Sequence, residues 1–418
     1  MQLLHIADLH FGRLLYGRSL MDDQRHFVRQ SLLPALDEYK PDALLIAGDL
    51  YDRQIASVDA IHLFDALIDA LCERNIPAVI ISGNHDSPDR IAVGKSLLAR
   101  HGIHIITELK EAFTPIEIGA AQIFPLPYFE NAQMRDFLGD ETLRGAGACM
   151  RAAIDKMTEA FDPTKKHILV AHCFAAGAST SDSESRIFVG GAGDVPTDVF
   201  SPFDYAALGH LHAAQRAGDT ARYAGSPLKY SVDEAHQKKS MTLVTLGDTV
   251  ETTCIPVTPL HDVKRIEGTF AALLENGQAA PNEDYVEILL TDDEPVFRPA
   301  DRLRQLLRRI VAAHLHQLGL LALLRDVYQD LPPGLLAQPF REQLHIRCRS
   351  IEAYARRHAV AHGIIALHKL ASCSFRLANL PHQIRFPVAQ AAIHKAEHFK
   401  AIPLRALRQG DDILFRDL

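Results

Sequence analysis

The chain has 418 residues, of which 47% are hydrophobic and 23% are charged, and its formal net charge is −8. This is the composition of an ordinary globular protein of two or three domains, and the lack of any run of about 18 apolar residues argues against a membrane span. The six cysteines form no C-x-x-C pair and the N-terminus lacks the layout of a signal peptide, so we expect free thiols and a cytoplasmic location rather than a disulfide framework.

Short apolar runs alternate with helical patterns through roughly the first 170 residues. This alternation predicts an α/β fold in which many of the strands pair in parallel. We expect strands over residues 2–7, 43–47, 78–81, 103–106 and 167–171, and helices over residues 22–38, 58–74, 91–100 and 148–161.

The character of the sequence changes after His172. Residues 175–191, AAGASTSDSESRIFVGG, are mostly small and polar, which predicts a long surface loop. A connector at 258–262 then leads into a small α+β domain over 263–303, where DYVEILLTD is a clear strand. Before that connector, strand-like segments occur at 205–208, 222–224, 241–246 and 252–257, and a second sheet is the simplest interpretation.

Residues 304–418 differ again, because they are rich in Leu, Arg and His and contain nine of the 22 histidines. From Arg304 onward the net charge is +9, which leaves −17 on the earlier part. An anionic substrate of the earlier part must therefore be met by a local positive feature. Three interpretations of the tail stay open: a divergent partner-binding helix pair, a basic DNA-binding extension, or an altered reading frame.

Polar side chains follow five of the apolar strands. Asp8 and His10 are two residues apart, so they point to the same face of extended backbone. Each strand ending alone has an ordinary explanation, such as a surface Asp, a loop His or a helix N-cap. Ligands gather beyond the carboxyl ends of strands in α/β sheets, so five such endings together predict one site. Its candidate residues are Asp8, His10, Asp49, Asn84, His85, His172, His210 and His212.

The donor atoms of this set are imidazole nitrogens and carboxylate or amide oxygens, with no thiolate. Such a set suits Mn²⁺, Fe²⁺ or Zn²⁺, with Mn²⁺ favoured and Mg²⁺ as an alternative. The side chains are too many for one ion. Two ions about 3.5–4 Å apart, bridged by a shared carboxylate, fit the set and have the geometry used for phosphoester hydrolysis.

In this order, the motifs D-x-H, G-D-x-x-D, G-N-H-D, a lone H and G-H-x-H resemble the calcineurin-like metallophosphoesterases. HIADLHFGR, AGDLYDR, SGNHDSPDR, SDSESRIFVGG, FDYAALGHLH and YAGSPLKYSVDEAHQKKS are similar to the SbcD family of bacterial nuclease subunits, over about residues 1–303. The resemblance implies a two-sheet αββα sandwich over 1–258 and a small α+β capping domain that starts at 263–303. Residues 304–418 depart from the family's pattern, and their fold is not predicted.

The resemblance also implies roles for the site residues. One ion would be held by Asp8, His10, Asp49 and His212, and the other by Asp49, Asn84, His172 and His210, with Asp49 bridging. His85 would contact the scissile phosphate and help the leaving group, as general acid or electrostatic stabiliser. This fits the residues themselves, because adjacent residues cannot easily both face one ion. Asp86 is expected to orient neighbouring groups.

The implied activity is metal-assisted hydrolysis of DNA phosphodiester bonds, as a double-strand exonuclease and a single-strand or hairpin endonuclease in DNA repair, recombination and replication. The implied partners are DNA and an SbcC-type ATPase subunit, in a heterotetramer that contains a homodimer of this chain. Arg13, Arg53 and Arg90 lie beside the motifs and are candidates to contact DNA phosphates, or else are surface arginines paired with local aspartates.

Two weaker signals concern neighbouring residues. DRIAVGKS ends like a P-loop, but Asp89 stands where that loop needs its first glycine. We therefore expect Lys95 and Ser96 to be helical and expect no ATP site in this chain. Asp52 is expected either to orient a ligand of the metal site or to cap the following helix.

Two other functions stay open. One is a different metallophosphoesterase activity, such as that of a protein phosphatase or a cyclic-nucleotide phosphodiesterase. The other is a non-catalytic DNA-end-binding subunit. Loss of a metal ligand would favour the non-catalytic subunit, yet every ligand that the resemblance implies is present.

Overall fold

The computed structural model describes residues 1–181, 183–184, 194–279, 282–292, 296, 299–303 and 307–315. It contains two compact units, of which the first comprises Met1–Arg265 and Glu283–Glu287. Except for residues 307–315, the tail to which the three interpretations refer lies outside the described residues, and so does most of the second half of the 175–191 loop. The four cysteines within the described residues are free thiols, as expected. No helix in the described part of the chain is long and apolar enough to cross a membrane.

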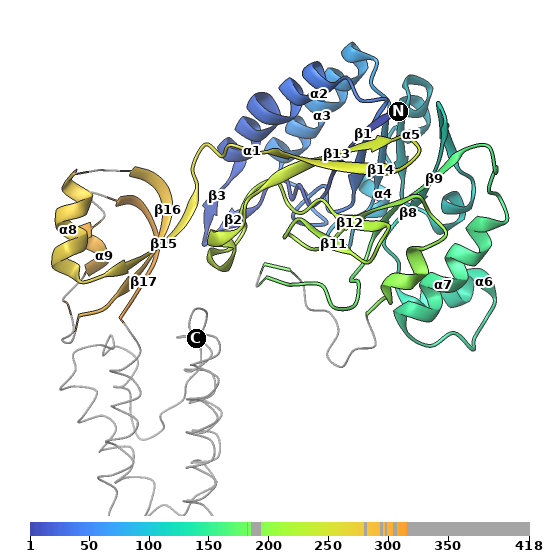
Figure 1. Cartoon of the computed structure of the whole chain (residues 1–418). Coiled ribbons are helices and arrows are strands. Elements are labelled where there is room, and N and C mark those ends of the chain that lie inside the picture. The colour runs from blue at the N-terminus through green and yellow to red at the C-terminus, as the bar shows by residue number, and fades with distance from the viewer. Residues whose placement is uncertain are drawn as a thin grey trace, which may run out of the picture. The chain divides into compact units, whose positions relative to one another are not determined.

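The first sheet contains the N-terminal strands of the chain (Figure 1). Its strand order is β14 (Val250–Pro256), β13 (Ser240–Leu246), β1 (Gln2–Ile6), β4 (Ala43–Ala47), β5 (Ala78–Ile81) and β6 (Ile103–Ile106). Strands β1, β4, β5 and β6 are parallel, whereas β13 is antiparallel to both β1 and β14. Every residue of β4 and β5 is buried, because both faces of this sheet are covered and only apolar side chains suit such strands.

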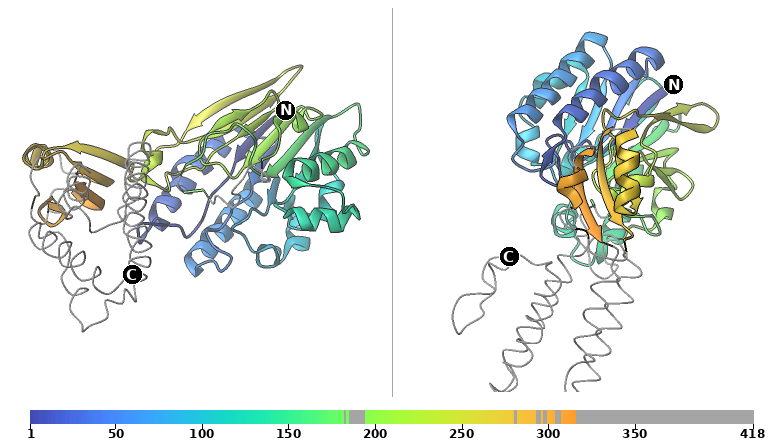
Figure 2. Two further views of the ribbon diagram at one scale, coloured as in Figure 1. Left: turned by 90° about the horizontal axis from the view of Figure 1, so that it is seen from below. Right: turned by 90° about the vertical axis from the view of Figure 1, so that its left-hand side faces the viewer.

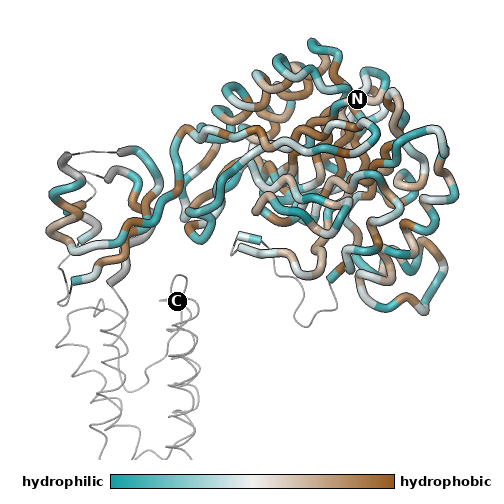
Figure 3. Tube along the Cα trace, in the orientation of Figure 1, coloured by the Kyte–Doolittle hydropathy of each residue, from teal (hydrophilic) through white to brown (hydrophobic). Residues whose placement is uncertain are grey.

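The second sheet is built around four parallel strands in the middle of the sequence. Its order is β11 (Gln215–Ala217), β12 (Ala221–Tyr223), β10 (Tyr205–Gly209), β9 (Lys166–His172), β8 (Ala121–Leu126) and β7 (Ile116–Ile118). The edge strands β11 and β7 are antiparallel to their neighbours. Leu3, Val79, Ile123, Val170 and Ala207 belong to the apolar cluster that joins the two sheets, and Figure 3 shows this concentration of hydrophobic residues.

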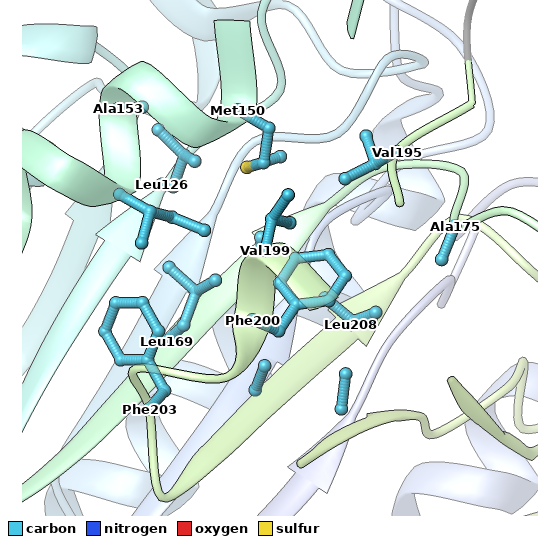
Figure 4. Close-up of a cluster of buried hydrophobic side chains, with 14 of the residues drawn as sticks. Leu126, Met150, Ala153, Leu169, Ala175, Val195, Val199, Phe200, Phe203 and Leu208 are labelled. Atoms are coloured by element: carbon cyan, nitrogen blue, oxygen red, sulfur yellow. The ribbon is translucent and has the colours of Figure 1, made fainter. Parts of the chain in front are cut away.

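Helices cover the outer face of each sheet (Figures 1 and 2). The first sheet carries α1 (Met21–Phe27), the π-helix η1 (Val28–Leu32), α2 (Leu33–Tyr39) and α3 (Val58–Arg74), and the second carries α6 (Asn131–Leu138) and α7 (Gly145–Thr158). Figure 4 shows how Met150 and Ala153 of α7 pack over Leu169 of β9 and Leu208 of β10. The layer order is therefore helix, sheet, sheet, helix, which confirms the αββα sandwich.

Helix α3 illustrates why the sequence forms these elements. The Ser57 hydroxyl accepts a hydrogen bond from the Ala60 backbone N–H at 3.3 Å, which caps the start of the helix. Asn75 ends it in the left-handed conformation, with φ of 52°. Its buried residues recur at spacings of three and four, so one face of the helix meets the sheet. They are Ala60, Leu63, Phe64, Leu67, Ile68, Ala70 and Leu71.

Some expected elements differ from those observed. The segments at 241–246 and 252–257 form β13 and β14 in the first sheet, not in a second sheet. Alternating apolar residues predict a strand but carry no information about its partner, and β13 pairs with the open side of β1. The 22–38 helix contains a π-helical segment, and 91–100 is divided into short turns: α4 (Pro88–Ile91), α5 (Lys95–Leu98) and η2 (Ala99–His101). Lys95 and Ser96 are helical, as expected.

Strands β7 and β8 were not expected from the sequence. Strand β7 has only three residues, and β8 contains Pro125, a residue that argues against a central strand. Two further strands, β2 (Leu14–Leu15) and β3 (Arg18–Ser19), form a small separate hairpin. The remaining described elements are short 3₁₀ helices: η3 (Leu109–Phe113), η4 (Thr197–Phe200) and η5 (Val232–His236).

The region after the connector is α+β, as the sequence indicates. It contains β15 (Val263–Gly268), α8 (Phe270–Ala279), β16 (Asn282–Leu290), α9 (Pro299–Leu303) and β17 (Leu307–Leu315). The three strands form one sheet in the order β15, β16, β17. The expected strand DYVEILLTD corresponds to β16, and β17 continues the sheet past residue 303.

A buried histidine joins the two sheets of the sandwich. His5 of β1 is fully buried, and its Nδ1 lies 2.9 Å from the hydroxyl of Tyr205 in β10. Its Nε2 has no hydrogen-bond partner among the residues that the structure describes. Burial, reinforced by the positive charge of Arg222, lowers the pKa of His5 from 6.5 to about 3. The ring is therefore neutral in the folded protein throughout the mildly acidic range.

His5 should make the protein less stable in mild acid. Above pH 6.5 the ring is neutral in both states, so its contribution to stability is complete; as the pH falls from 6.5 toward 3, the unfolded chain binds a proton that the folded chain does not. In EDTA, we expect His5→Leu to shrink the difference in unfolding free energy between about pH 7.5 and about pH 5 by about 2 kcal/mol. An unchanged difference would show that His5 is charged or solvated in the native state.

Candidate metal centre

The parallel strands of both sheets deliver the predicted site residues to one place. Asp8 and His10 follow β1, Asp49 follows β4, and Asn84 and His85 follow β5 in the first sheet. His172 ends β9, and His210 and His212 follow β10 in the second sheet. Three of these residues, Asp8, His10 and His212, offer ligand atoms that lie within 4.8 Å of one another, and so do Asp8, Asp49 and His172.

Backbone strain is concentrated in this cluster. Asp8, His10, Asp49 and His210 have φ values of 54°, 42°, 50° and 101°. They are four of the seven non-glycine residues with positive φ in the described part of the chain. Such conformations cost about 1–3 kcal/mol each and are retained where the surrounding structure enforces them, most often at functional sites.

Three glycines allow the strand ends to approach one another. Gly48, Gly83 and Gly209 immediately precede Asp49, Asn84 and His210. A Cβ atom at Gly48 would lie 2.3 Å from His172 Nδ1, and one at Gly83 would lie 2.1 Å from Asp49 Oδ1. One at Gly209 would lie 1.8 Å from the Ala47 carbonyl oxygen. The glycines of the G-D, G-N-H and G-H motifs are therefore required because a side chain would clash at each position, and Gly48 also has a positive φ of 88°.

Gly209→Ala should destabilise the metal-free protein by at least about 1–3 kcal/mol. The added methyl group would overlap the Ala47 carbonyl oxygen, so the backbone of β4 or β10 would have to shift. Urea unfolding in EDTA measures this cost. Gly247→Ala is the matched control, since its nearest neighbour would be an ordinary 3.6 Å contact. Equal unfolding midpoints for the two variants would contradict the close approach at Gly209.

The first group of side chains centres on two facing imidazoles. His10 Nε2 lies 3.2 Å from His212 Nε2 and 3.6 Å from Asp49 Oδ2. The Asp8 carboxylate accepts from the backbone N–H of His210 at 2.9 Å, which fixes its orientation. The side chains of Asp8, His10, Asp49 and His212 are all almost completely buried.

The second group shares Asp49 with the first. Asp49 Oδ2 lies 3.4 Å from His172 Nε2, and Asn84 Oδ1 lies 2.9 Å from that same nitrogen and 3.1 Å from His210 Nδ1. His172 Nδ1 donates to the Ala47 carbonyl at 2.9 Å, which turns Nε2 toward Asp49 and Asn84. One Asp49 carboxylate oxygen thus contacts an imidazole of each group.

Burial strongly perturbs the ionisation of the cluster. It raises the pKa of Asp8 to about 7 and lowers the pKa of His210 to about 3, and it holds the pKa of His10 well below its ordinary value. Burial would also lower the pKa of His172, but the carboxylates of Asp49 and Asp8 outweigh it and raise that pKa to about 9.

The residues fit a divalent metal ion. Two Nε2 atoms that face each other at 3.2 Å cannot both carry a proton, and a cation would accept the lone pair of each. Within the described part of the chain, Nδ1 of buried His10 has no hydrogen-bond partner, although buried imidazole nitrogens are usually paired. The donors are imidazole, carboxylate and amide groups, a mixed set suited to Mn²⁺, Fe²⁺ or Zn²⁺.

Asn84 and His85 point in different directions, as their adjacency suggested. The amide of Asn84 meets His172 and His210, whereas the ring of His85 lies edge-on to His10, with 4.8 Å between ring centroids. The backbone N–H of His85 donates to Asp49 Oδ1 at 2.9 Å, and its Nδ1–H donates to the Asp52 carbonyl at 2.9 Å.

Asp86 holds the loops that carry these residues. Its buried carboxylate accepts hydrogen bonds from the backbone N–H groups of Leu50, Tyr51 and Gly83, at 3.1, 2.9 and 2.9 Å. It thereby connects the loop after β4 to the loop after β5, in line with the orienting role expected for it.

The three candidate arginines have different surroundings. Arg13 forms a 2.6 Å ion pair with Asp52 and stacks over Tyr230, and its side chain is only 18% exposed. Arg53 is 70% exposed and lies 3.5 Å from Asp52, and Arg90 is exposed on α4. The paired-arginine alternative thus describes both Arg13 and Arg53, although Arg53, like Arg90, is open to solvent.

Sequence reasoning missed two residues that support His10. The Gln24 amide donates to the His10 carbonyl at 2.7 Å, and the Tyr230 hydroxyl donates to the Leu9 carbonyl at 2.6 Å. Both come from segments distant from the D-x-H motif, one from α1 and one from the segment before η5. No spacing rule could have assigned either residue to the site.

Comparison with known proteins gives the family. The calcineurin-like phosphoesterase model matches residues 1–214, and the model called Type 5 capsule protein repressor C-terminal domain, or SbcD_C, matches residues 259–329. The SbcD subunit of nuclease SbcCD from Staphylococcus epidermidis (strain ATCC 12228 / FDA PCI 1200) is 31% identical over 317 residues, which are 75% of this chain and 84% of that protein. The chain belongs to the SbcD nuclease subunits within the calcineurin-like phosphoesterases.

The SbcD likeness reaches further along the chain than the motifs indicated. The resemblance seen in the sequence ended at about residue 303, whereas the C-terminal family model extends to residue 329. A solved chain at 11% identity aligns over 61% of this chain and 98% of its own length with a TM-score of 0.38, which is too low to carry an argument. The metallophosphoesterase domain and the buried Asp/His cluster together indicate an SbcD-like enzyme with a divalent metal site.

Proposed function

We propose that this chain is the nuclease subunit of an SbcCD-type complex and hydrolyses DNA phosphodiester bonds at a two-metal centre. The convergence of two Asp/His groups that share Asp49 supports this proposal most strongly. We assign the first ion to Asp8, His10, Asp49 and His212, and the second to Asp49, Asn84, His172 and His210.

Two bound divalent ions would supply an activated water and neutralise charge on the phosphate. The chain's own residues have separate jobs. Asp49 bridges the two groups. The Asp52 carbonyl accepts a hydrogen bond from His85 Nδ1–H, which leaves His85 Nε2 to face the phosphate. His85 would help the leaving group depart as general acid or electrostatic stabiliser.

An anionic substrate needs a local positive feature in this acidic part of the chain. The earlier part of the chain is acidic, so two divalent ions would be the focused positive charge that DNA meets. Exposed Arg53 and Arg90 are the candidates for contacts with DNA phosphates. Arg13 is a weaker candidate, because its guanidinium lies closer to Asp52 than that of Arg53 does and its side chain is only 18% exposed. We propose Mn²⁺ as the ion, because the site mixes carboxylate and amide oxygens with imidazole.

The assembly belongs to the same proposal. The name of the relative from Staphylococcus epidermidis describes that protein as one subunit of nuclease SbcCD. We propose an SbcC-type ATPase as partner and a homodimer of this chain within a heterotetramer. ATP dependence would then come from the partner, and double-strand exonuclease and hairpin endonuclease activities from this chain.

Substrate choice tests the proposal. Purified protein is incubated with Mn²⁺ and, in separate reactions, end-labelled duplex DNA, hairpin DNA, a phosphopeptide or a cyclic nucleotide, with and without an SbcC-type ATPase and ATP. We expect cleavage of DNA that EDTA abolishes. Hydrolysis of the phosphopeptide or cyclic nucleotide with DNA left intact would favour another metallophosphoesterase activity, and DNA binding without cleavage would favour a non-catalytic role.

A further inference from the structure

His212 is enclosed by side chains to which the proposed reaction assigns no role. They come from two segments, residues 181–184 and residues 234–239. The backbone N–H of His212 donates to Glu184 Oε1 at 2.6 Å, and its carbonyl accepts from Lys239 Nζ at 2.9 Å. Its Nδ1 lies 2.6 Å from Ser183 Oγ and 3.3 Å from Glu234 Oε1. Every polar atom of the residue except Nε2 thus meets this shell.

Lys239 keeps Glu234 ionised in the interior. The Glu234 side chain is completely buried, and its Oε2 lies 2.5 Å from the ammonium group of Lys239, which is itself only 6% exposed. Lys239 Nζ also contacts Ser226 Oγ and Gln237 Oε1, each at 2.8 Å. A buried ion pair that is also hydrogen-bonded on its remaining protons can hold both charges, so Glu234 offers acceptor atoms only.

Hydrogen-bond capacity then determines where the proton of His212 lies. The Ser183 hydroxyl donates its one proton to Glu234 Oε1. Ser183 can therefore only accept from His212, and Glu234 can only accept as well. The proton of the neutral imidazole must lie on Nδ1, which leaves its lone pair on Nε2, 3.2 Å from His10 Nε2.

We propose that Ser183, Glu234 and Lys239 form a relay that fixes the tautomer and orientation of His212 as a metal ligand. This inference rests on the proposed function, because it takes His212 as a ligand of the first ion. The three are positioning residues: they act through His212 and touch neither substrate nor the reacting atoms. Outer carboxylates of this kind raise the basicity of a ligating imidazole.

The relay also explains two stretches of sequence to which the metal-ligand motifs assign no physical role. SDSES supplies Ser183 and Glu184, and DEAHQKK supplies Glu234 and Lys239. They lie about 50 residues apart in sequence, and the Ser183–Glu234 hydrogen bond joins them behind the metal centre. The contacts of these two stretches with His212, a proposed metal ligand, are a sufficient reason for their serine, glutamate and lysine residues.

The experiment is a calorimetric Mn²⁺ titration of metal-free protein, together with its thermal unfolding in EDTA. Glu234→Gln removes the anionic acceptor, and Ser183→Ala breaks the relay at a half-buried position where folding should survive. We expect one of the two Mn²⁺ ions to bind about 10- to 100-fold more weakly in Glu234→Gln, with the other unchanged. Ser183→Ala should weaken the same ion, and Ser183→Thr, which keeps a hydroxyl, should restore it. Exposed Glu251→Gln is the matched control.

Three results would overturn the inference. In the first, wild type binds two Mn²⁺ ions and both Glu234→Gln and Ser183→Ala bind them with wild-type affinity. In the second, the variants weaken both ions equally and Ser183→Ala also lowers the unfolding temperature of the metal-free protein, which would reveal a purely structural role. In the third, wild type itself binds fewer than two ions, which would remove the proposed metal centre and this inference with it. If Glu234→Gln does not fold, Ser183→Ala and Ser183→Thr decide the question.

Discussion

Asp49→Asn should remove cleavage activity almost completely and leave at most one weakly bound Mn²⁺ per chain. The reason is geometric: one carboxylate oxygen of Asp49 lies 3.6 Å from His10 Nε2 and 3.4 Å from His172 Nε2, so both ligand groups lose their shared anion. Metal-assisted charge stabilisation is worth several kcal/mol, and we therefore expect a rate loss of at least about 10³-fold. Single-turnover cleavage of labelled duplex DNA and metal content by mass spectrometry measure the two effects.

The control for this variant is Asp65→Asn, since Asp65 is an exposed carboxylate on α3, away from the cluster. It should keep both metal ions and the wild-type rate. Circular dichroism establishes that Asp49→Asn remains folded. A folded Asp49→Asn protein that retains two Mn²⁺ ions would refute the bridging role of this residue.

His85→Gln should separate metal binding from chemistry. His85 contacts Asp49 through its backbone and Asp52 through its ring, and it lies beside the imidazole of His10 without belonging to either proposed ligand set. We expect two Mn²⁺ ions to bind with wild-type affinity while the cleavage rate falls about 10²- to 10⁴-fold, the usual contribution of a general acid or base.

His62→Gln, an exposed substitution on α3, serves as the control for the loss of an imidazole. It should change neither metal content nor rate. If His85→Gln cleaves DNA as fast as wild type under single-turnover conditions, the residue has no part in the chemical step. If it loses a metal ion, it acts as a ligand and the assignment of the second group must change.

The sandwich could be predicted in outline because its parallel strands are buried on both faces. Strands such as β4 and β5 are continuous apolar runs, and their ends are marked by glycine and polar residues. Local sequence determines such elements directly. It does not determine which edge a strand joins, and β13 and β14 therefore belong to the first sheet although they follow the strands of the second.

The candidate site could be predicted as a set of residues but not as a geometry. Parallel strands place their carboxyl ends at one edge, so Asp8, Asp49 and Asn84 had to lie near one another. The relay behind His212 depends on contacts between Ser183, Glu234 and Lys239, which are close only after folding. The inward position of Arg13 likewise depends on Asp52, a partner 39 residues away.

The metal content of the wild-type protein tests the two-metal centre most directly. Metal-free protein is loaded with excess Mn²⁺, freed of unbound ion and assayed by mass spectrometry alongside Asp49→Asn. We predict two Mn²⁺ ions per wild-type chain and at most one in the variant. One ion per wild-type chain, or the same content in both proteins, would contradict a centre in which Asp49 joins two groups of ligands.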